Sequence, residues 1–323
     1  MKIIVLDGYT GNPGDLSWNE FEKLGEFICY DRTPENDEVI IAERIGDADV
    51  VITNRTPVSS AVMEHCPNLH YIGVLATDYS MVDIAAAKQC GIVVTNVPGY
   101  GTASISQHAI ALLLEVCHRV GAHDESVKNG DWDTCEDSSY WLYPLIELDK
   151  KTLGIIGLGK TGKATAAVGS AFGMKVLATD PAVIFDASED TIPVEICDME
   201  TLLRESDVIM LHCPPNPATQ RIINRKTIKK MKDGVIIISV GDDMLIDAQD
   251  LAAALNSGKV YAAGLDGLPD FHDGDNPLMT AKNCIITPRI GWASKESRAR
   301  LMDIAVESLA YFAEGNAVNV VNS

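Results

Sequence analysis

Short apolar runs alternate with longer, mixed stretches through the first hundred residues. The runs lie at 3–6, 27–30, 50–53, 71–75 and 92–95. Runs of four or five apolar residues have the length of buried strands, and a stretch such as 81–89 between two of them has the composition of a helix. Strands that alternate with helices in this way predict a parallel sheet with helices packed on its faces.

The same alternation returns in the second half of the chain, with apolar runs at 153–156, 174–179, 208–211, 235–239, 260–265 and 284–287. A long segment at 104–128 predicts one helix, and 294–314 predicts the last helix of the chain. The pattern therefore predicts an α/β protein with two parallel-sheet domains. Ligands of such sheets bind beyond the carboxyl ends of the strands, so the residues that follow each run are candidates for function.

A glycine-rich turn follows the run at 153–156. Gly157, Gly159 and Gly162 have the spacing G-x-G-x-x-G, and the small residues after them predict a helix. In a strand–turn–helix–strand unit this spacing is typical of dinucleotide binding, because the glycines permit a tight turn, approach of a pyrophosphate and close helix packing, in that order. The helix N-terminus, at Lys160 and Thr161, would present N–H groups to the phosphates.

The second strand of this unit ends at Asp180, roughly twenty residues beyond the glycines. A carboxylate at this place accepts hydrogen bonds from the ribose hydroxyls of adenosine and repels a 2′-phosphate. Pro181 follows it instead of an arginine. We therefore expect the cofactor to be NAD and not NADP.

Composition limits the classes of partner. The 323 residues suffice for two domains, and a net charge of −20 argues against nucleic acid or an anionic membrane as a partner. No apolar run has the length of a membrane span. The eight cysteines form no C-x-x-C pair, so neither a metal site nor a disulfide framework is expected. These features predict a cytoplasmic protein.

Separated segments of the chain resemble one enzyme family. They include Asn-Val-Pro-Gly-Tyr-Gly-Thr at 96–102, and the stretches at 6–17, 71–77 and 143–148. Together they are similar to the D-isomer-specific 2-hydroxyacid dehydrogenases, and within that family to the glycerate (hydroxypyruvate) dehydrogenase branch. The resemblance runs through nearly the whole chain.

The resemblance implies two Rossmann-like domains. A flavodoxin-like substrate domain would comprise residues 1–101 and 294–323, and a doubly wound NAD-binding domain would comprise 102–293. It also implies an NAD-dependent oxidoreductase that acts on a small 2-oxo or 2-hydroxy acid, and a homodimer formed through the NAD-binding domain.

The resemblance further assigns site residues. The backbone of Leu75, Ala76 and Thr77 corresponds to the loop that receives the substrate carboxylate. The positions that correspond to cofactor contacts are Cys213 and Pro214 on the adenine side, Asp266 at the nicotinamide amide, and also Val240 and Gly291.

The three catalytic positions of the family carry other residues in this chain. Asp242 stands where the family has arginine, Phe271 where it has glutamate, and Arg289 where it has the acid/base histidine. Hydride transfer to a ketone needs a cation to orient the substrate and a proton donor, and the family's donor is that histidine. Asp78 and Ser80 also replace the glycine and asparagine that are common beside the carboxylate loop.

Three interpretations follow from these substitutions. In the first, the protein binds NAD(H) as a catalytically silent regulator or scaffold, and Asp242 and Arg289 form a salt bridge across the former active site. In the second, Arg289 holds the substrate, His272 acts as acid/base, and Asp242 orients one of them. In the third, the chain is an ordinary dehydrogenase whose catalytic positions lie elsewhere. We predict an NAD-dependent oxidoreductase-type protein with a non-standard active site, with the silent NAD(H) protein as the alternative.

Overall fold

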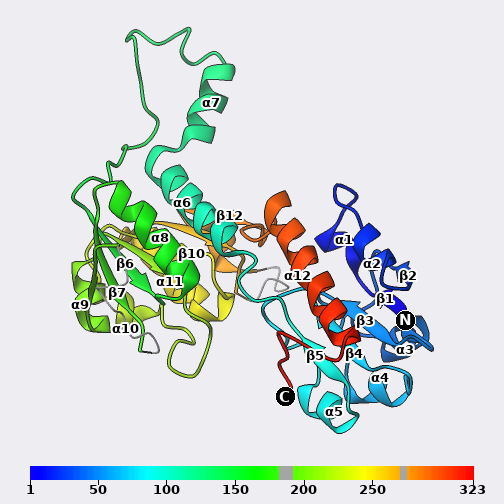
Figure 1. Cartoon of the computed structure of the whole chain (residues 1–323). Helices are drawn as coiled ribbons and strands as arrows, with labels where there is room; N and C mark the ends of the chain where they lie inside the picture. Colours follow the sequence, from blue (N-terminus) through cyan, green and yellow to red (C-terminus); the bar gives the residue numbers. More distant parts are fainter. Residues whose placement is uncertain (182–191, 270–274) are drawn as a thin grey trace. The chain divides into compact units, whose positions relative to one another are not determined.

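The computed structural model describes residues 1–181, 192–269 and 275–323. These residues form two compact units (Figure 1). Unit 1 comprises Met1–Gly101 together with Ala293–Ser323, and unit 2 comprises Thr102–Trp292.

Unit 1 is built on a five-stranded parallel sheet with the order β2-β1-β3-β4-β5. Its strands are β1 (Lys2–Val5), β2 (Glu26–Cys29), β3 (Val50–Thr53), β4 (Tyr71–Val74) and β5 (Val93–Thr95). The chain passes from β1 to β2 on one side and then returns to β3 on the other. The strand order therefore reverses between β1 and β3, which is the flavodoxin-like arrangement.

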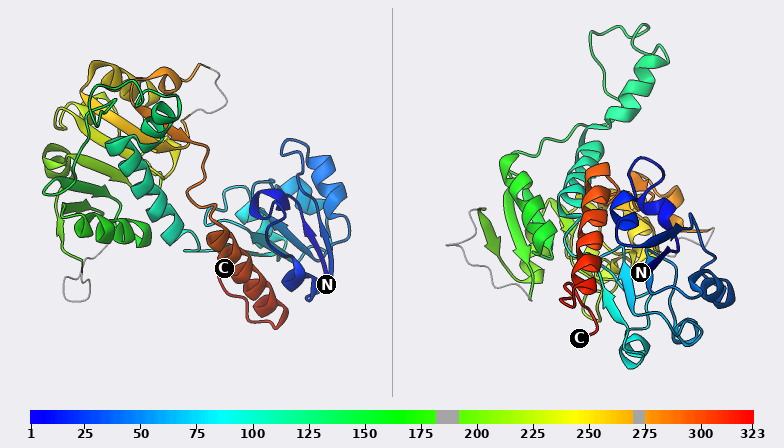
Figure 2. Two further views of the ribbon diagram at one scale, coloured as in Figure 1. Left: turned by 90° about the horizontal axis from the view of Figure 1, so that it is seen from above. Right: turned by 45° about the vertical axis from the view of Figure 1, so that its right-hand side comes forward.

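Six helices lie among or after these strands: α1 (Gly8–Gly11), α2 (Asn19–Glu22), α3 (Glu38–Ile45), α4 (Ser60–Glu64), α5 (Ile84–Gln89) and α12 (Lys295–Ala313). The C-terminal helix α12 lies against the sheet of this unit (Figure 2). The ring of Phe312 lies 4.8 Å from that of Tyr71 on β4, centroid to centroid. Tyr71 is fully buried, so this contact helps to join the last helix to the N-terminal sheet.

Unit 2 is built on a seven-stranded parallel sheet with the order β12-β11-β10-β9-β6-β7-β8. Its strands are β6 (Thr152–Ile156), β7 (Lys175–Thr179), β8 (Val194–Ile196), β9 (Val208–Leu211), β10 (Val235–Ser239), β11 (Val260–Asp266) and β12 (Cys284–Thr287). The strand order reverses between β6 and β9, so this sheet is doubly wound. The predicted fold class, two parallel-sheet Rossmann-like domains, is confirmed.

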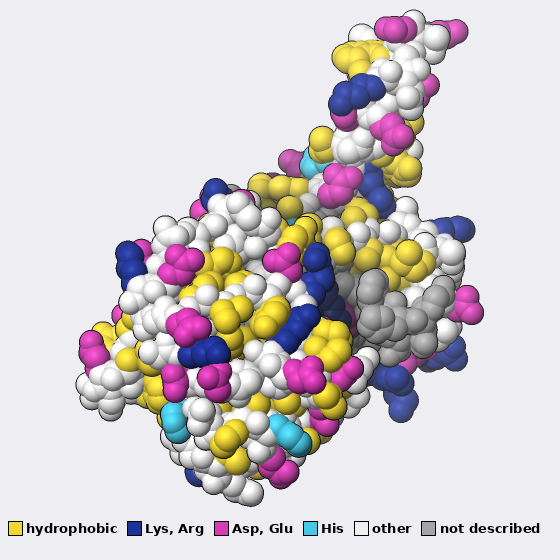
Figure 3. Space-filling view, turned by 90° about the vertical axis from the view of Figure 1, so that its right-hand side faces the viewer, with side chains coloured by type: hydrophobic (Ala, Val, Ile, Leu, Met, Phe, Trp, Pro, Cys, Tyr) yellow, Lys and Arg dark blue, Asp and Glu magenta, His cyan; other side chains and the backbone are white. Residues whose placement is uncertain are grey.

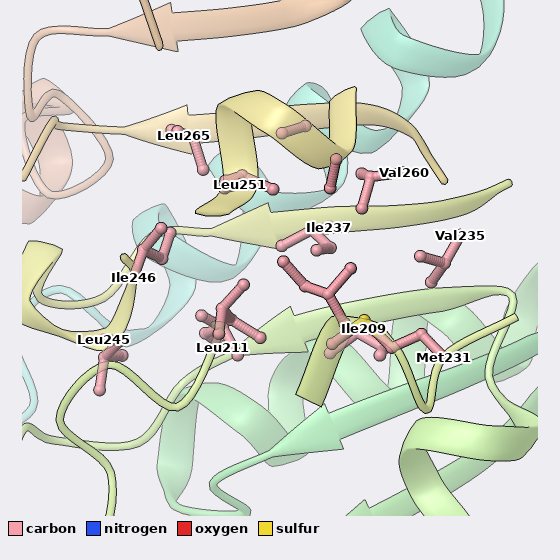
Figure 4. Packing of buried hydrophobic residues seen from close by; sticks show 14 of the residues in the cluster. Ile209, Leu211, Met231, Val235, Ile237, Leu245, Ile246, Leu251, Val260 and Leu265 are labelled. Carbon is pink, nitrogen blue, oxygen red and sulfur yellow. The ribbon is translucent and has the colours of Figure 1, made fainter. Parts of the chain in front are cut away.

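The helices of unit 2 are α6 (Thr102–His118), α7 (Val120–Lys128), α8 (Lys160–Ala171), α9 (Met199–Glu205), α10 (Arg225–Ile228) and α11 (Ala248–Ser257), with short 3₁₀ helices η1 (Asp243–Leu245) and η2 (Pro277–Thr280). A buried cluster packs on each face of the sheet. One of them joins Ile209 on β9, Ile237 on β10 and Leu251 on α11 (Figure 4). No described helix is long and apolar enough to cross a bilayer.

The single helix predicted at 104–128 is wrong, because it breaks at Arg119. This residue has a φ of 49°, in the left-handed region, which ends α6 and redirects the chain into α7. Residues 120–147, here called the arm, then extend away from the sheet of unit 2 (Figure 1). The sequence pattern of apolar residues carried no signal for this break.

Candidate active site

The glycine turn lies at the end of β6, where the strand order of unit 2 reverses. Gly157 has a φ of 98°, and a Cβ on it would lie 2.4 Å from the backbone N of Cys213. A Cβ on Gly162 would lie 2.1 Å from the carbonyl oxygen of Gly157. Both glycines are therefore required by the fold itself, because a side chain would displace the adjoining backbone.

Gly159 is different from these two glycines. It precedes the first turn of α8, it is exposed, and no described atom lies within 4 Å of the Cβ it would carry. The open space lies at a helix N-terminus, beside Lys160 and Thr161, where unpaired N–H groups and the helix dipole favour an anion. The turn fits the pyrophosphate of NAD.

Asp180 lies beside this turn, directly after β7. Its Oδ2 accepts a hydrogen bond of 2.8 Å from the backbone N–H of Leu158. Because β6 and β7 are neighbours in register, Ile156 opposite Thr179, the carboxylate is held at the level of the glycines. This placement agrees with the expected role at the adenosine ribose.

The end of β9 supplies an uncharged wall to the same edge of the sheet. Burial raises the pKa of the Cys213 thiol to about 11 and lowers the pKa of the His212 imidazole to about 4. Both side chains are therefore neutral near pH 7, and Cys213 is not a thiolate nucleophile. The neighbouring Pro214 is exposed. The wall is suited to an aromatic base rather than to a charged group.

Asp266, at the end of β11, is almost fully buried and heavily hydrogen-bonded. One carboxylate oxygen accepts from Thr287 Oγ1 at 2.7 Å and from the backbone of Ile290 at 2.8 Å, and the other accepts from the backbone of Gly291 at 2.7 Å. Burial alone would raise the pKa of Asp266. The hydrogen bonds, that of His108 first among them, outweigh burial and hold the pKa below its usual range.

His108 is a member of this cluster that the sequence did not assign. It projects from α6, and its Nε2 lies 2.9 Å from Thr287 Oγ1 and 3.4 Å from Asp266 Oδ1. A contact between residues so far apart along the chain leaves no periodic signal in the sequence. His108 fixes the side chain of Asp266, which the family resemblance places at the nicotinamide amide.

The ion pair expected between Asp242 and Arg289 does not form in the structure. Arg289 pairs instead with Asp243, the next residue along the chain. Asp242 caps η1, and its carboxylate accepts a hydrogen bond of 2.8 Å from the backbone N–H of Met244. This cap holds the Asp242 carboxylate on its own backbone, while Asp243 contacts the arginine above Gly267.

Arg289 has a φ of 55°, unusual for a residue with a side chain, and such backbone strain is often found at functional sites. Its side chain is half-exposed and lines a cavity of about 830 Å³. Four aspartates and a second arginine also line this cavity, namely Asp242, Asp243, Asp247, Asp275 and Arg221. His272 and Phe271, the remaining candidates at this edge, lie outside the described residues. Val240 precedes the cap in the same loop and is half-buried.

Unit 1 contains the loop expected to receive a carboxylate. The carbonyl of Leu75 accepts from Asn54 Nδ2 at 2.5 Å, that of Ala76 from the backbone of Val97 at 2.9 Å, and that of Thr77 from Asn96 Nδ2 at 2.8 Å. The N–H groups of Ala76 and Thr77 have no acceptor among the described residues. The loop is thus fixed through its carbonyls, and its successive N–H groups are of the kind that form a backbone anion site.

The Asp78 carboxylate forms its hydrogen bonds with Ser80 and not with the N–H groups of the Leu75–Thr77 loop. It accepts hydrogen bonds from the backbone N–H of Ser80 at 3.3 Å and from Ser80 Oγ at 2.6 Å. Asp78 and Ser80 thus form a local turn beside the loop.

Within the described residues no group of three or more histidine, cysteine or acidic side chains is placed to hold a metal ion.

A doubly wound sheet with a glycine turn at its switch point, joined in one chain to a flavodoxin-like sheet, defines the class of two-domain NAD-dependent dehydrogenases. Comparison with known proteins identifies the family. Residues 110–291 match the NAD-binding domain of the D-isomer-specific 2-hydroxyacid dehydrogenases. The chain is 56% identical to hydroxypyruvate reductase of Blautia hydrogenotrophica and 34% identical to glycerate dehydrogenase of Methylorubrum extorquens. Both matches span all of this chain and 99% or more of the relative.

A solved structure agrees with these matches. The apo-structure of D-lactate dehydrogenase from Escherichia coli superposes with a TM-score of 0.86 at 26% identity, over 99% of this chain and 100% of the other. The chain therefore belongs to the D-isomer-specific 2-hydroxyacid dehydrogenase family, in the branch of glycerate dehydrogenases and hydroxypyruvate reductases. Its cofactor is NAD, as the glycine turn and Asp180 predicted.

Proposed function

We propose that the protein is an NAD-dependent oxidoreductase that interconverts a small 2-oxo acid and its 2-hydroxy acid in a non-standard active site. The observation that carries this proposal is the preserved recognition geometry. The open turn at Gly159 fits the cofactor, and the N–H groups of Ala76 and Thr77 fit a substrate carboxylate. The 56% identity to a hydroxypyruvate reductase supports the same class of substrate.

The roles of the residues follow from their chemistry. NADH, when bound, supplies the hydride for the carbonyl carbon. In unit 2, Arg289 can polarise a carbonyl or hold an anion, but an arginine does not lose its proton in proteins and cannot serve as acid/base. Reduction to the alcohol also consumes one proton, so another donor is needed, and His272 remains the candidate from the sequence. Asp266, fixed by His108, would hold the nicotinamide amide.

The test combines binding and turnover in one preparation. Calorimetry measures the affinity for NADH, and absorbance at the NADH band then follows oxidation with hydroxypyruvate, glyoxylate and pyruvate. Turnover of any of these acids supports the proposal. Tight NADH binding without turnover, and without binding of oxamate as an unreactive 2-oxo acid analogue, would contradict it.

A second candidate is a catalytically silent NAD(H)-binding regulator or scaffold, and one observation favours it. Arg289, which the family resemblance aligns with the acid/base histidine, already forms an ion pair with Asp243. The triple variant Asp242→Arg, Phe271→Glu, Arg289→His restores the three family residues. If only the catalytic residues were lost, this variant should reduce 2-oxo acids where the unaltered protein does not. Reduction by the unaltered protein would remove this candidate.

We also infer that the protein forms a homodimer through unit 2. The arm exposes large apolar side chains, with Trp132 51%, Trp141 66% and Leu145 53% accessible. Apolar side chains are visible on this projecting segment in Figure 3. So much apolar surface on one projecting segment is typical of an interface. Sedimentation should show a dimer that dissociates in the variant Trp141→Ser, Leu145→Ser. Val39→Ser, which changes an equally exposed residue of unit 1, is the control and should leave the dimer intact.

A further inference from the structure

A network of hydrogen bonds fixes the switch point of unit 1. Asp7, directly after β1, accepts from three successive backbone N–H groups after β3: Asn54 at 2.7 Å, Arg55 at 2.6 Å and Thr56 at 2.8 Å. The hydroxyl of Thr56 donates to the same carboxylate at 3.0 Å. Asp7 is 9% exposed, so one buried carboxylate sets the backbone of this turn. In open parallel sheets the switch point is where ligands bind.

The same turn is linked to the carboxylate loop. Asn54 Nδ2 donates to the carbonyl of Leu75, and the N–H of Leu75 donates to the carbonyl of Thr53 at 2.7 Å. Strands β3 and β4 are neighbours with Thr53 opposite Val74. Counting on from this register places Arg55 at the level of Ala76. Arg55, which follows β3, therefore lies at the same level of the sheet edge as the N–H groups of Ala76 and Thr77, which follow β4.

Arg55 is exposed, and no described carboxylate lies within ion-pair distance of its guanidinium. Its charge is felt by Tyr100 of the same unit. Burial raises the pKa of the Tyr100 phenol to about 12, and the positive charge of Arg55 acts in the opposite direction. In a chain with a net charge of −20, an exposed arginine whose backbone is fixed and whose guanidinium has no acidic partner among the described residues is suited to an anion from outside.

We propose that Arg55 is the cation that binds the substrate carboxylate, acting with the N–H groups of the Leu75–Thr77 loop in place of the arginine that position 242 lacks. This inference rests on the proposed function, since it assigns a residue to the same substrate. A planar guanidinium binds a carboxylate through two parallel hydrogen bonds, which gives orientation as well as affinity. The loss of the cation at Asp242 is then compensated within unit 1.

The test measures oxamate binding to the protein–NADH complex by calorimetry. Arg55→Met should weaken oxamate binding about 10- to 100-fold, the usual value of a hydrogen-bonded charged group, and leave NADH affinity and melting temperature unchanged. Arg55→Lys keeps the charge without the two-pronged geometry, so it should recover part of the loss. The matched control is Arg32→Met, an exposed arginine that follows the outer strand β2.

The outcomes separate this inference from the proposed function. Equal oxamate affinity in the unaltered protein and in Arg55→Met would overturn the role of Arg55 and leave the proposed function intact. Absence of oxamate binding and of turnover in the unaltered protein would overturn the proposed function and this inference with it. If Arg55→Met does not fold, Arg55→Gln, which keeps a polar side chain of similar reach, answers the same question.

Discussion

The guanidinium of Arg289 is paired with the carboxylate of Asp243, which joins the end of β12 to the end of β10. The family resemblance aligns Arg289 with the acid/base histidine of the family. Replacement by arginine exchanges a group that titrates near neutral pH for one that stays charged. The ion pair reduces the positive potential that Arg289 offers to the cavity it lines.

Asp243→Asn should release Arg289 from its ion pair and strengthen oxamate binding to the NADH complex by several-fold. The Arg289 side chain is 47% exposed, so the loss of the pair should change the free energy of unfolding by less than about 1 kcal/mol. Calorimetry and thermal melting measure the two effects. The control is Asp242→Asn, which removes an equal charge but leaves the ion pair, and it should have the smaller effect on oxamate. Equal effects of the two variants would contradict a specific role of the pair.

Gly159→Val should weaken NADH binding about tenfold or more while leaving the melting temperature unchanged, because its side chain would enter the open space for the pyrophosphate and not the protein. Gly157→Ala should instead destabilise the fold by about 2 kcal/mol or more, from its positive φ and from the clash with Cys213. Calorimetry with NADH and thermal melting of both variants separate the two effects. A Gly159→Val protein with normal NADH affinity would show that the turn no longer binds nucleotide.

Asp180→Ala should weaken NADH binding about tenfold and reduce the discrimination against NADPH, because both the acceptor for the ribose hydroxyls and the repulsion of a 2′-phosphate are lost. The hydrogen bond from Leu158 is lost as well, so a small fall in melting temperature is expected. Titrations with NADH and NADPH measure the ratio of affinities. An unchanged ratio would exclude Asp180 from cofactor selection.

His108→Leu should flatten the dependence of stability on acid pH. The pKa of Asp266 in the folded protein lies below its ordinary value, so the ionised carboxylate stabilises the fold above pH ~4, and this stabilisation is lost as the pH falls through the folded pKa. Without His108 the pKa of Asp266 should rise, and about 1 kcal/mol of stability at neutral pH should be lost.

Thermal melts of His108→Leu between pH 3 and pH 7 test this expectation. The variant should melt below the unaltered protein at pH 7 and approach it at low pH, since both then carry a protonated Asp266. His118→Leu, on the same helix but exposed, should follow the unaltered protein throughout. A constant difference across the pH range would mean that His108 acts through packing alone.

The sequence by itself determined most of the strands and the position of the dinucleotide turn. Most of the strands match apolar runs, because fully buried parallel strands need uninterrupted apolar residues. The dinucleotide turn could also be predicted from the sequence, because Gly157, Gly162 and Asp180 lie close together along the chain, within one βαβ unit. Strand β8 escaped prediction because it is only partly buried and carries no apolar run.

Only the tertiary structure decided which charges meet. The sequence marked Asp242 and Arg289 as the altered positions, but a cap on η1 turned Asp242 onto its own backbone and left Asp243 as the partner. His108 contacts Asp266, and Asp7 accepts a hydrogen bond from the backbone N–H of Arg55. Each pair is too far apart along the chain for the periodicity of the sequence to predict it. Periodicity reports which side of an element is buried. The partner of a polar side chain depends on where strand ends from distant parts of the chain come together, and that is a property of the folded sheet alone.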